Sequence, residues 1–112
     1  MTSQSWALPD DLRQLAETGE EDLVKEVLAV FQSDTTERLT KLRNGLAGND
    51  RGVVKSQAHA IKGSAGQVGA MRVAAICQSI ESGAPTAGVA DLQDLVRQLE
   101  SAFAEVSRAM SA

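Results

Sequence analysis

His59 is the only histidine of the 112-residue chain, and the residues around it are of the types that phosphoryl chemistry uses. If its surroundings form a helix, Lys55 and Lys62 lie about one turn away, because residues three and four apart share a helix face. Phosphoryl transfer spreads charge over three oxygens in its transition state, and positioned cations stabilise that charge. His59 and Lys62, with Lys55 nearby, therefore form a candidate phosphoacceptor site.

Two glycines lie on the same expected face as the histidine. Gly63 and Gly66 follow His59 by four and seven residues, and each costs a helix interior about 1 kcal/mol relative to alanine. Glycines that serve packing within the chain would be expected on the apolar side instead. Bare backbone beside the histidine would let another molecule approach, so Lys55, Gly63 and Gly66 are predicted to contact a partner. A solvated face that tolerates glycine is the alternative.

The spacing of a helical hairpin predicts a carboxylate beside the histidine. If the chain reverses near Gly69 and Ala70, positions 59 and 81 lie level, since both are eleven residues from position 70. Glu81 could then accept the hydrogen of Nδ1, fix the tautomer and leave Nε2 as the exposed nucleophile. The alternative is an ordinary surface glutamate near the end of a helix.

Five helical segments are predicted from the apolar periodicity. They span about 9–17, 21–46, 51–68, 70–82 and 92–110. On the histidine helix, about 51–68, Val54, Ala58 and Ile61 mark the arc that faces the core, and His59 lies outside it. Four long helices with short connections predict an all-α fold, an antiparallel four-helix bundle with an additional short N-terminal helix. The chain length predicts a single domain, 1–112, with the bundle core at about 21–110.

Charge is distributed unevenly along the chain. The formal net charge of −4 argues against binding to nucleic acid, yet the segment from Arg51 to Ile80 holds four cations and no acid. No apolar stretch approaches the roughly 20 residues of a membrane span, and the first residues lack the pattern of a signal peptide. We therefore expect a cytoplasmic protein that does not insert in a membrane, and a monomer.

The single cysteine, Cys77, excludes an intramolecular disulfide. Its neighbours at helical spacing, Ile76 and Ile80, predict a buried thiol. A metal site of His59, Cys77 and Glu81 is disfavoured, because Cys77 would face the core and a fourth ligand is lacking. Neither a metal site nor a cofactor of the chain's own is expected.

The run from His59 to Ala70, HAIKGSAGQVGA, resembles the signature of the histidine-containing phosphotransfer (HPt) domain family. Residues 72–81 are similar to the helix that follows this signature in the family. Departures are small: Ile61 replaces the usual leucine, and Gly66 is an additional glycine. The resemblance implies phosphorylation on the imidazole of His59, attraction of the phosphoryl oxygens by Lys62, and a hydrogen bond between Glu81 and the ring. It also implies a helical bundle without kinase activity of its own.

The same resemblance implies a phosphorelay intermediate of two-component signalling. Its partners would be a response-regulator receiver domain, a hybrid sensor histidine kinase, or both. The receiver would supply Mg²⁺, because the 30 residues from Arg51 to Ile80 contain no acid. A nucleotide-binding glycine motif is also absent from the sequence. Two alternatives remain: an interaction module that binds without phosphotransfer, and the phosphoacceptor domain of a chemotaxis-type kinase.

Overall fold

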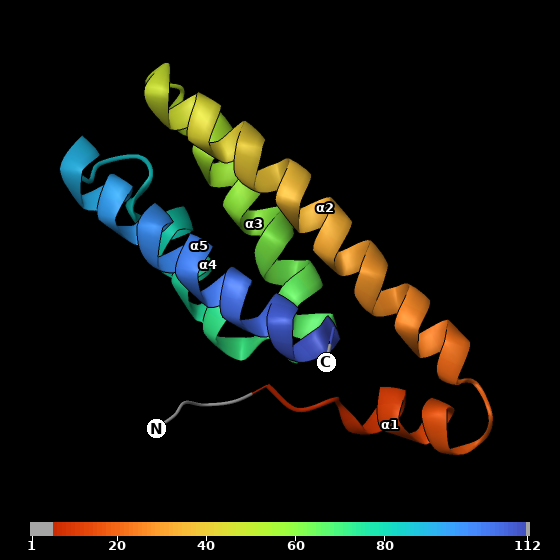
Figure 1. Ribbon diagram of the computed structural model, residues 1–112. Coiled ribbons are helices and arrows are strands. Elements are labelled where there is room, and N and C mark those ends of the chain that lie inside the picture. The colour runs from red at the N-terminus through yellow and green to blue at the C-terminus, as the bar shows by residue number, and fades with distance from the viewer. Residues whose placement is uncertain (1–5, 112) are drawn as a thin grey trace.

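The computed structural model describes residues 6–111, which form helices joined by short connections. The helices are α1 (Asp10–Glu17), α2 (Glu21–Ala47), α3 (Arg51–Gln67), α4 (Met71–Gly83) and α5 (Val89–Ser111). Within these residues there is no strand, so the predicted all-α fold is confirmed. Figure 1 shows α2 to α5 running side by side, with α1 set across one end. This is the predicted four-helix bundle with a short N-terminal helix.

The four long helices close around one apolar core. Each packs on the next in chain order, and α5 also contacts α2. An edge-to-face pair of Phe31 and Phe103, with ring centroids 5.9 Å apart, joins α2 to α5. The fully buried side chains of the core include Leu42, Val54, Ile61, Val73, Cys77, Ile80, Leu92 and Leu99. Of the described residues, none lies in a helix that is both long and apolar enough to cross a membrane.

The turn between α3 and α4 is fixed by both its backbone and a contact from the N-terminal segment. Gly69 has a φ of +74°, a left-handed conformation that favours glycine. A side chain there would also meet Pro9, because a Cβ on Gly69 would lie 2.9 Å from Pro9 Cγ. Trp6 donates its indole N–H to the carbonyl oxygen of Val68 at 2.7 Å. The segment before α1 therefore lies against this turn.

Helix α2 is longer than the helix it packs against. Its 27 residues span about 40 Å, whereas the 17 residues of α3 span about 25 Å. The N-terminal part of α2 therefore extends past α3, and α1 packs against α2. Two large apolar side chains remain exposed along this part of α2, Leu23 at 43% and Val30 at 61%.

Thr35 is a buried polar position in the middle of α2. The periodic apolar stripe passes through it, its side chain is fully buried, and its hydroxyl has no hydrogen-bond partner within the described residues. A buried hydroxyl without a partner lowers stability, since burial removes its bonds to water.

We expect Thr35→Val to raise the free energy of unfolding by about 1 kcal/mol, measured by urea denaturation. The matched control is Thr36→Val, one residue along, whose exposed hydroxyl donates to the Gln32 carbonyl at 2.8 Å. That substitution should not stabilise. A loss of stability in Thr35→Val would mean that the hydroxyl has a partner in solution.

Candidate functional site

The imidazole of His59 is exposed on α3 and bonded to Glu81 of α4. Its side chain is 68% exposed, whereas that of Glu81 is 17% exposed, and 2.8 Å separates Nδ1 from Oε2. A carboxylate only accepts hydrogen bonds, so Nδ1 must carry the hydrogen of this contact. In the neutral ring Nε2 then holds the free lone pair. The hairpin spacing thus correctly placed Glu81 level with His59.

Lys62 joins the same cluster from α3. Its ammonium donates to the second oxygen of Glu81, Oε1, at 2.7 Å and to Gln78 Oε1 at 2.9 Å. One carboxylate is therefore shared: one oxygen bonds the ring and the other bonds the ammonium. Lys62 lies on the His59 side of α3, as expected from its spacing, and 30% of its side chain is exposed.

The environment of Glu81 favours its charged form. The hydrogen bond from Lys62 is the main cause that lowers the pKa of this carboxyl, and the bond to His59 lowers it further, while partial burial acts in the opposite direction. Glu81 is therefore an anion at neutral pH. This matters for the ring, because a protonated carboxyl could not hold the Nδ1 hydrogen in the same way.

The predicted partner-binding residues lie on the open side of α3. A Cβ added at Gly63 or Gly66 would meet nothing within 4 Å, so packing within the chain does not require either glycine. Lys55 is exposed, and within the described residues it forms neither a hydrogen bond nor an ion pair. All three are free to meet another molecule.

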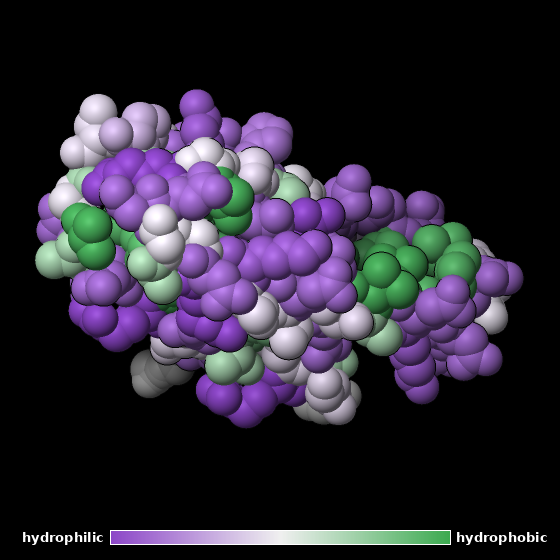
Figure 2. Space-filling view, turned by 90° about the horizontal axis from the view of Figure 1, so that it is seen from above, coloured by the Kyte–Doolittle hydropathy of each residue, from purple (hydrophilic) through white to green (hydrophobic). Residues whose placement is uncertain are grey.

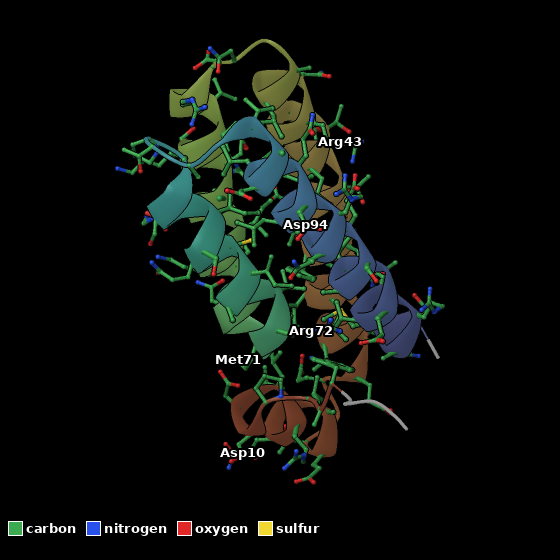
Figure 3. The ribbon with its side chains drawn as sticks, turned by 90° about the vertical axis from the view of Figure 1, so that its left-hand side faces the viewer. Asp10, Arg43, Met71, Arg72 and Asp94 are labelled. Carbon is green, nitrogen blue, oxygen red and sulfur yellow. The ribbon has the colours of Figure 1, made fainter. Side chains whose placement is uncertain are left out.

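The other two cations of the acid-free segment, Arg51 and Arg72, bind groups away from His59. Arg51 donates to the carbonyl oxygens of Ala84 and Ala87 at 3.0 and 2.7 Å, and so ties α3 to the loop after α4. Arg72 lies at the end of α4 nearest α1 (Figure 3) and pairs with Glu105 at 3.4 Å. Positive charge beside His59 therefore comes from Lys55 and Lys62 alone among these four.

Gln78 was not identified from the sequence as part of the site. The hairpin spacing contained the signal, because positions 62 and 78 are both eight residues from position 70 and therefore lie level. The structure adds this amide to the cluster through its bond with Lys62.

Cys77 is buried in the core, as its neighbours predicted. Burial is the main cause that raises its pKa to about 12, so the thiol stays protonated. The described residues contain no group of three or more His, Cys, Asp or Glu side chains placed to hold a metal ion.

Comparison with known proteins agrees with this geometry. The profile of the family described as "Hpt domain" matches residues 26–109. The crystal structure of histidine-containing phosphotransfer protein B (HptB) from Pseudomonas aeruginosa PAO1 is similar, with 30% sequence identity and a TM-score of 0.81 over 93% of this chain and 90% of that one. A search of curated protein sequences found no match.

The chain therefore belongs to the Hpt domain family. Its general function is histidine phosphotransfer in a phosphorelay, as a phosphocarrier and not as a kinase. Hpt proteins act in such relays together with receiver domains and hybrid kinases.

The shared carboxylate generates a prediction about its titration. We expect Lys62→Ala to raise the pKa of Glu81 toward its ordinary value of 4.5, because the strongest bond to the charged form is lost. Carbon-detected NMR of the Glu81 carboxyl measures this. With a lowered pKa in the folded state, the contact stabilises the wild type above the ordinary pKa and loses this effect as the pH falls through the folded value.

The control is Lys41→Ala, which removes an exposed lysine paired with Glu37 at 3.7 Å elsewhere on α2. The Glu81 titration should be unchanged in that variant. An unchanged titration in Lys62→Ala would contradict the contact between Lys62 and Glu81.

Proposed function

We propose that His59 accepts a phosphoryl group on Nε2 from the aspartyl phosphate of one receiver domain and passes it to an aspartate of another. The observation that carries this proposal is the 2.8 Å contact of Nδ1 with Glu81, in a ring that is 68% exposed. The contact occupies the inner nitrogen and leaves the outer one free. A nucleophile with a fixed tautomer, open to a partner, is what transfer between proteins requires.

In the proposed transfer, the phosphoryl group moves from the aspartate oxygen to Nε2 of His59 in a single displacement. The Nε2 lone pair attacks phosphorus, the N–P bond forms, and the P–O bond to the aspartate breaks, so that the aspartate leaves as a carboxylate. The Nδ1 hydrogen stays in place, and the ring acquires positive charge. Glu81 would then stabilise that charge as well as the tautomer, because its carboxylate already bonds Nδ1. Return of the phosphoryl group to a second aspartate reverses these steps.

Lys62 would stabilise the phosphoryl oxygens. Its ammonium has three donors, of which Glu81 and Gln78 take two, so that one remains for an incoming oxygen. A cation already held near the ring costs little reorganisation when charge develops on the phosphoryl group.

Magnesium in this reaction would be bound by the receiver. The ion prefers carboxylate and other oxygen ligands. The acid-free segment around His59 offers none, and both oxygens of Glu81 are already engaged with the ring and the ammonium. The residues beside His59 do not fit a magnesium site, so an acidic pocket on the partner would complete the reacting centre.

The docking face would extend from His59 along α3 to a groove beside α2. This groove of about 290 Å³ is lined by Val27, Val30, Phe31 and Val68, with Glu26 and Asp34 among its polar residues. Figure 2 shows apolar surface gathered at the end of the molecule where the N-terminal half of α2 lies. Gln67, which also lines the groove, is eight residues past His59 and therefore about 12 Å along the helix.

A standard protein interface covers about 800 Å² on each partner. A receiver seated on His59 would therefore also cover Gly63, Gly66 and this groove. The larger cavity of about 630 Å³ lies elsewhere, beside Trp6, Met71 and Arg72 near the α3–α4 turn. We assign it no part in the transfer, because it is remote from the reacting nitrogen.

The first test of the proposed function is His59→Gln. The substitution should change the free energy of unfolding by less than about 0.5 kcal/mol, because the ring is exposed, and should abolish labelling. Wild type and variant are incubated with a panel of phosphorylated receiver domains, and acid-labile, base-stable label on this chain is measured. Label on His59→Gln would mean that another residue accepts the phosphoryl group. No label on wild type with any receiver or hybrid kinase would leave the interaction module as the remaining explanation.

A second test separates docking from chemistry. Val30→Lys should weaken receiver binding by about tenfold, since a charge replaces an apolar contact, while labelling of His59 by phosphoramidate, a small donor that needs no docking, stays unchanged. Met71→Lys is the matched control, because Met71 is 64% exposed on α4, away from the groove, and Val30 is 61% exposed. Equal effects of the two substitutions on receiver binding would exclude the groove from the docking face.

A further inference from the structure

We propose that Gln78 is a positioning residue, which holds the ammonium of Lys62 beside His59 without neutralising it. The inference rests on the proposed function, because it concerns how the cation reaches the phosphoryl group. Lys62 lies between two acceptors on α4, Gln78 Oε1 at 2.9 Å and Glu81 Oε1 at 2.7 Å. Two bonds define the place of an ammonium far better than one, because the lysine stem is long and flexible.

The orientation of the Gln78 amide is set by a residue further along α4. Gln78 Nε2 donates to Ser82 Oγ at 2.8 Å, which leaves Oε1 turned toward Lys62. An ammonium has only donors, so the reversed amide would bring two donors together. Gln78, Glu81 and Ser82 are spaced i, i+3 and i+4 and share one face of α4. The helix thus presents two acceptors to the lysine, and Ser82 supports one of them.

The neutrality of Gln78 has a chemical reason. Glu81 already contributes one negative charge to balance Lys62, and a second carboxylate would leave the cluster with net negative charge. Phosphoryl oxygens arriving at Nε2 would then be repelled. An amide supplies the second acceptor without that charge.

These contacts contribute little to folding, because Gln78 is exposed and Lys62 is partly exposed. Stability measurements therefore do not reveal the role of Gln78. That role is measured by the rate of phosphotransfer and by the hydrogen exchange of the Lys62 ammonium.

The decisive experiment is a double-mutant cycle on the rate of phosphotransfer from a phosphorylated receiver to His59. Gln78→Ala should slow transfer about threefold to tenfold, the effect of losing one bond to a partly exposed charged group. Lys62→Ala should slow it more. If Gln78 acts through Lys62, the double variant should be no slower than Lys62→Ala alone. An unchanged rate in Gln78→Ala, or the same further loss in the Lys62→Ala background, would overturn the proposal.

Charge and geometry are separated by Gln78→Glu, which keeps an acceptor of the same shape. This variant should also be slower, and addition of salt should recover part of the loss, because screening weakens the repulsion. The control is Gln14→Glu, which adds the same charge on exposed α1. An effect of Gln14→Glu equal to that of Gln78→Glu would mean that net charge, and not the local cluster, sets the rate.

A spectroscopic measurement checks the positioning directly. The Lys62 ammonium should give a nitrogen NMR signal whose hydrogens exchange more slowly with water in wild type than in Gln78→Ala, and Ser82→Ala should lie between them. Equal exchange in all three would contradict the proposal. Failure of the proposed function is distinguishable, because it removes His59-dependent label from the wild type itself, whereas failure of this inference leaves wild-type labelling intact.

Discussion

Reversal of the chain at Gly69 and Ala70 determines which residues of α3 and α4 stand level. The left-handed φ of Gly69 and the close approach of Pro9 fix the turn. From there, eight residues in each direction bring Lys62 to Gln78, and eleven bring His59 to Glu81. A shift of one residue in either helix would rotate one partner by about 100° and separate both pairs. The polar cluster therefore depends on the geometry of a chain reversal that lies about two to three helical turns away.

Within the cluster, the Glu81 carboxylate is the group on which the others depend. Its two oxygens serve different neighbours, so that the tautomer of the ring and the place of the ammonium are linked through a single side chain. The exposed fraction of the side chain increases from Glu81 at 17% to Lys62 at 30% and His59 at 68%. The shared carboxylate is the most enclosed of the three groups, and the imidazole is the most open. The helix pair thus fixes the cluster, and Gly63 and Gly66 leave the surface beside the ring open.

Much of this arrangement is predictable from the sequence, because helical periodicity and equal spacing about a glycine turn are local properties. They place His59 outside the core and Glu81 beside it. The contact between Gln78 and Lys62 was not predicted, because an uncharged amide is not an obvious partner for an ammonium. The hydrogen bonds of Arg51 could not be predicted, since they go to the carbonyl oxygens of Ala84 and Ala87. Every residue has a backbone carbonyl, so the residue types do not indicate which one a side chain will bind. The groove beside Val30 depends on how far α2 extends past α3, which only packing decides.

The polar contacts that surround His59 all lie within one helical hairpin, and the most distant partners, His59 and Glu81, are 22 residues apart in the chain. The exposed valine and the acidic residues of the groove belong to α2 instead. If the groove belongs to the docking face as proposed, part of the recognition surface is thus encoded outside the hairpin that holds the polar cluster. Substitutions on the outer face of α2 would then change the choice of receiver and leave the polar cluster intact, so that duplicated copies of the gene could acquire separate signalling routes.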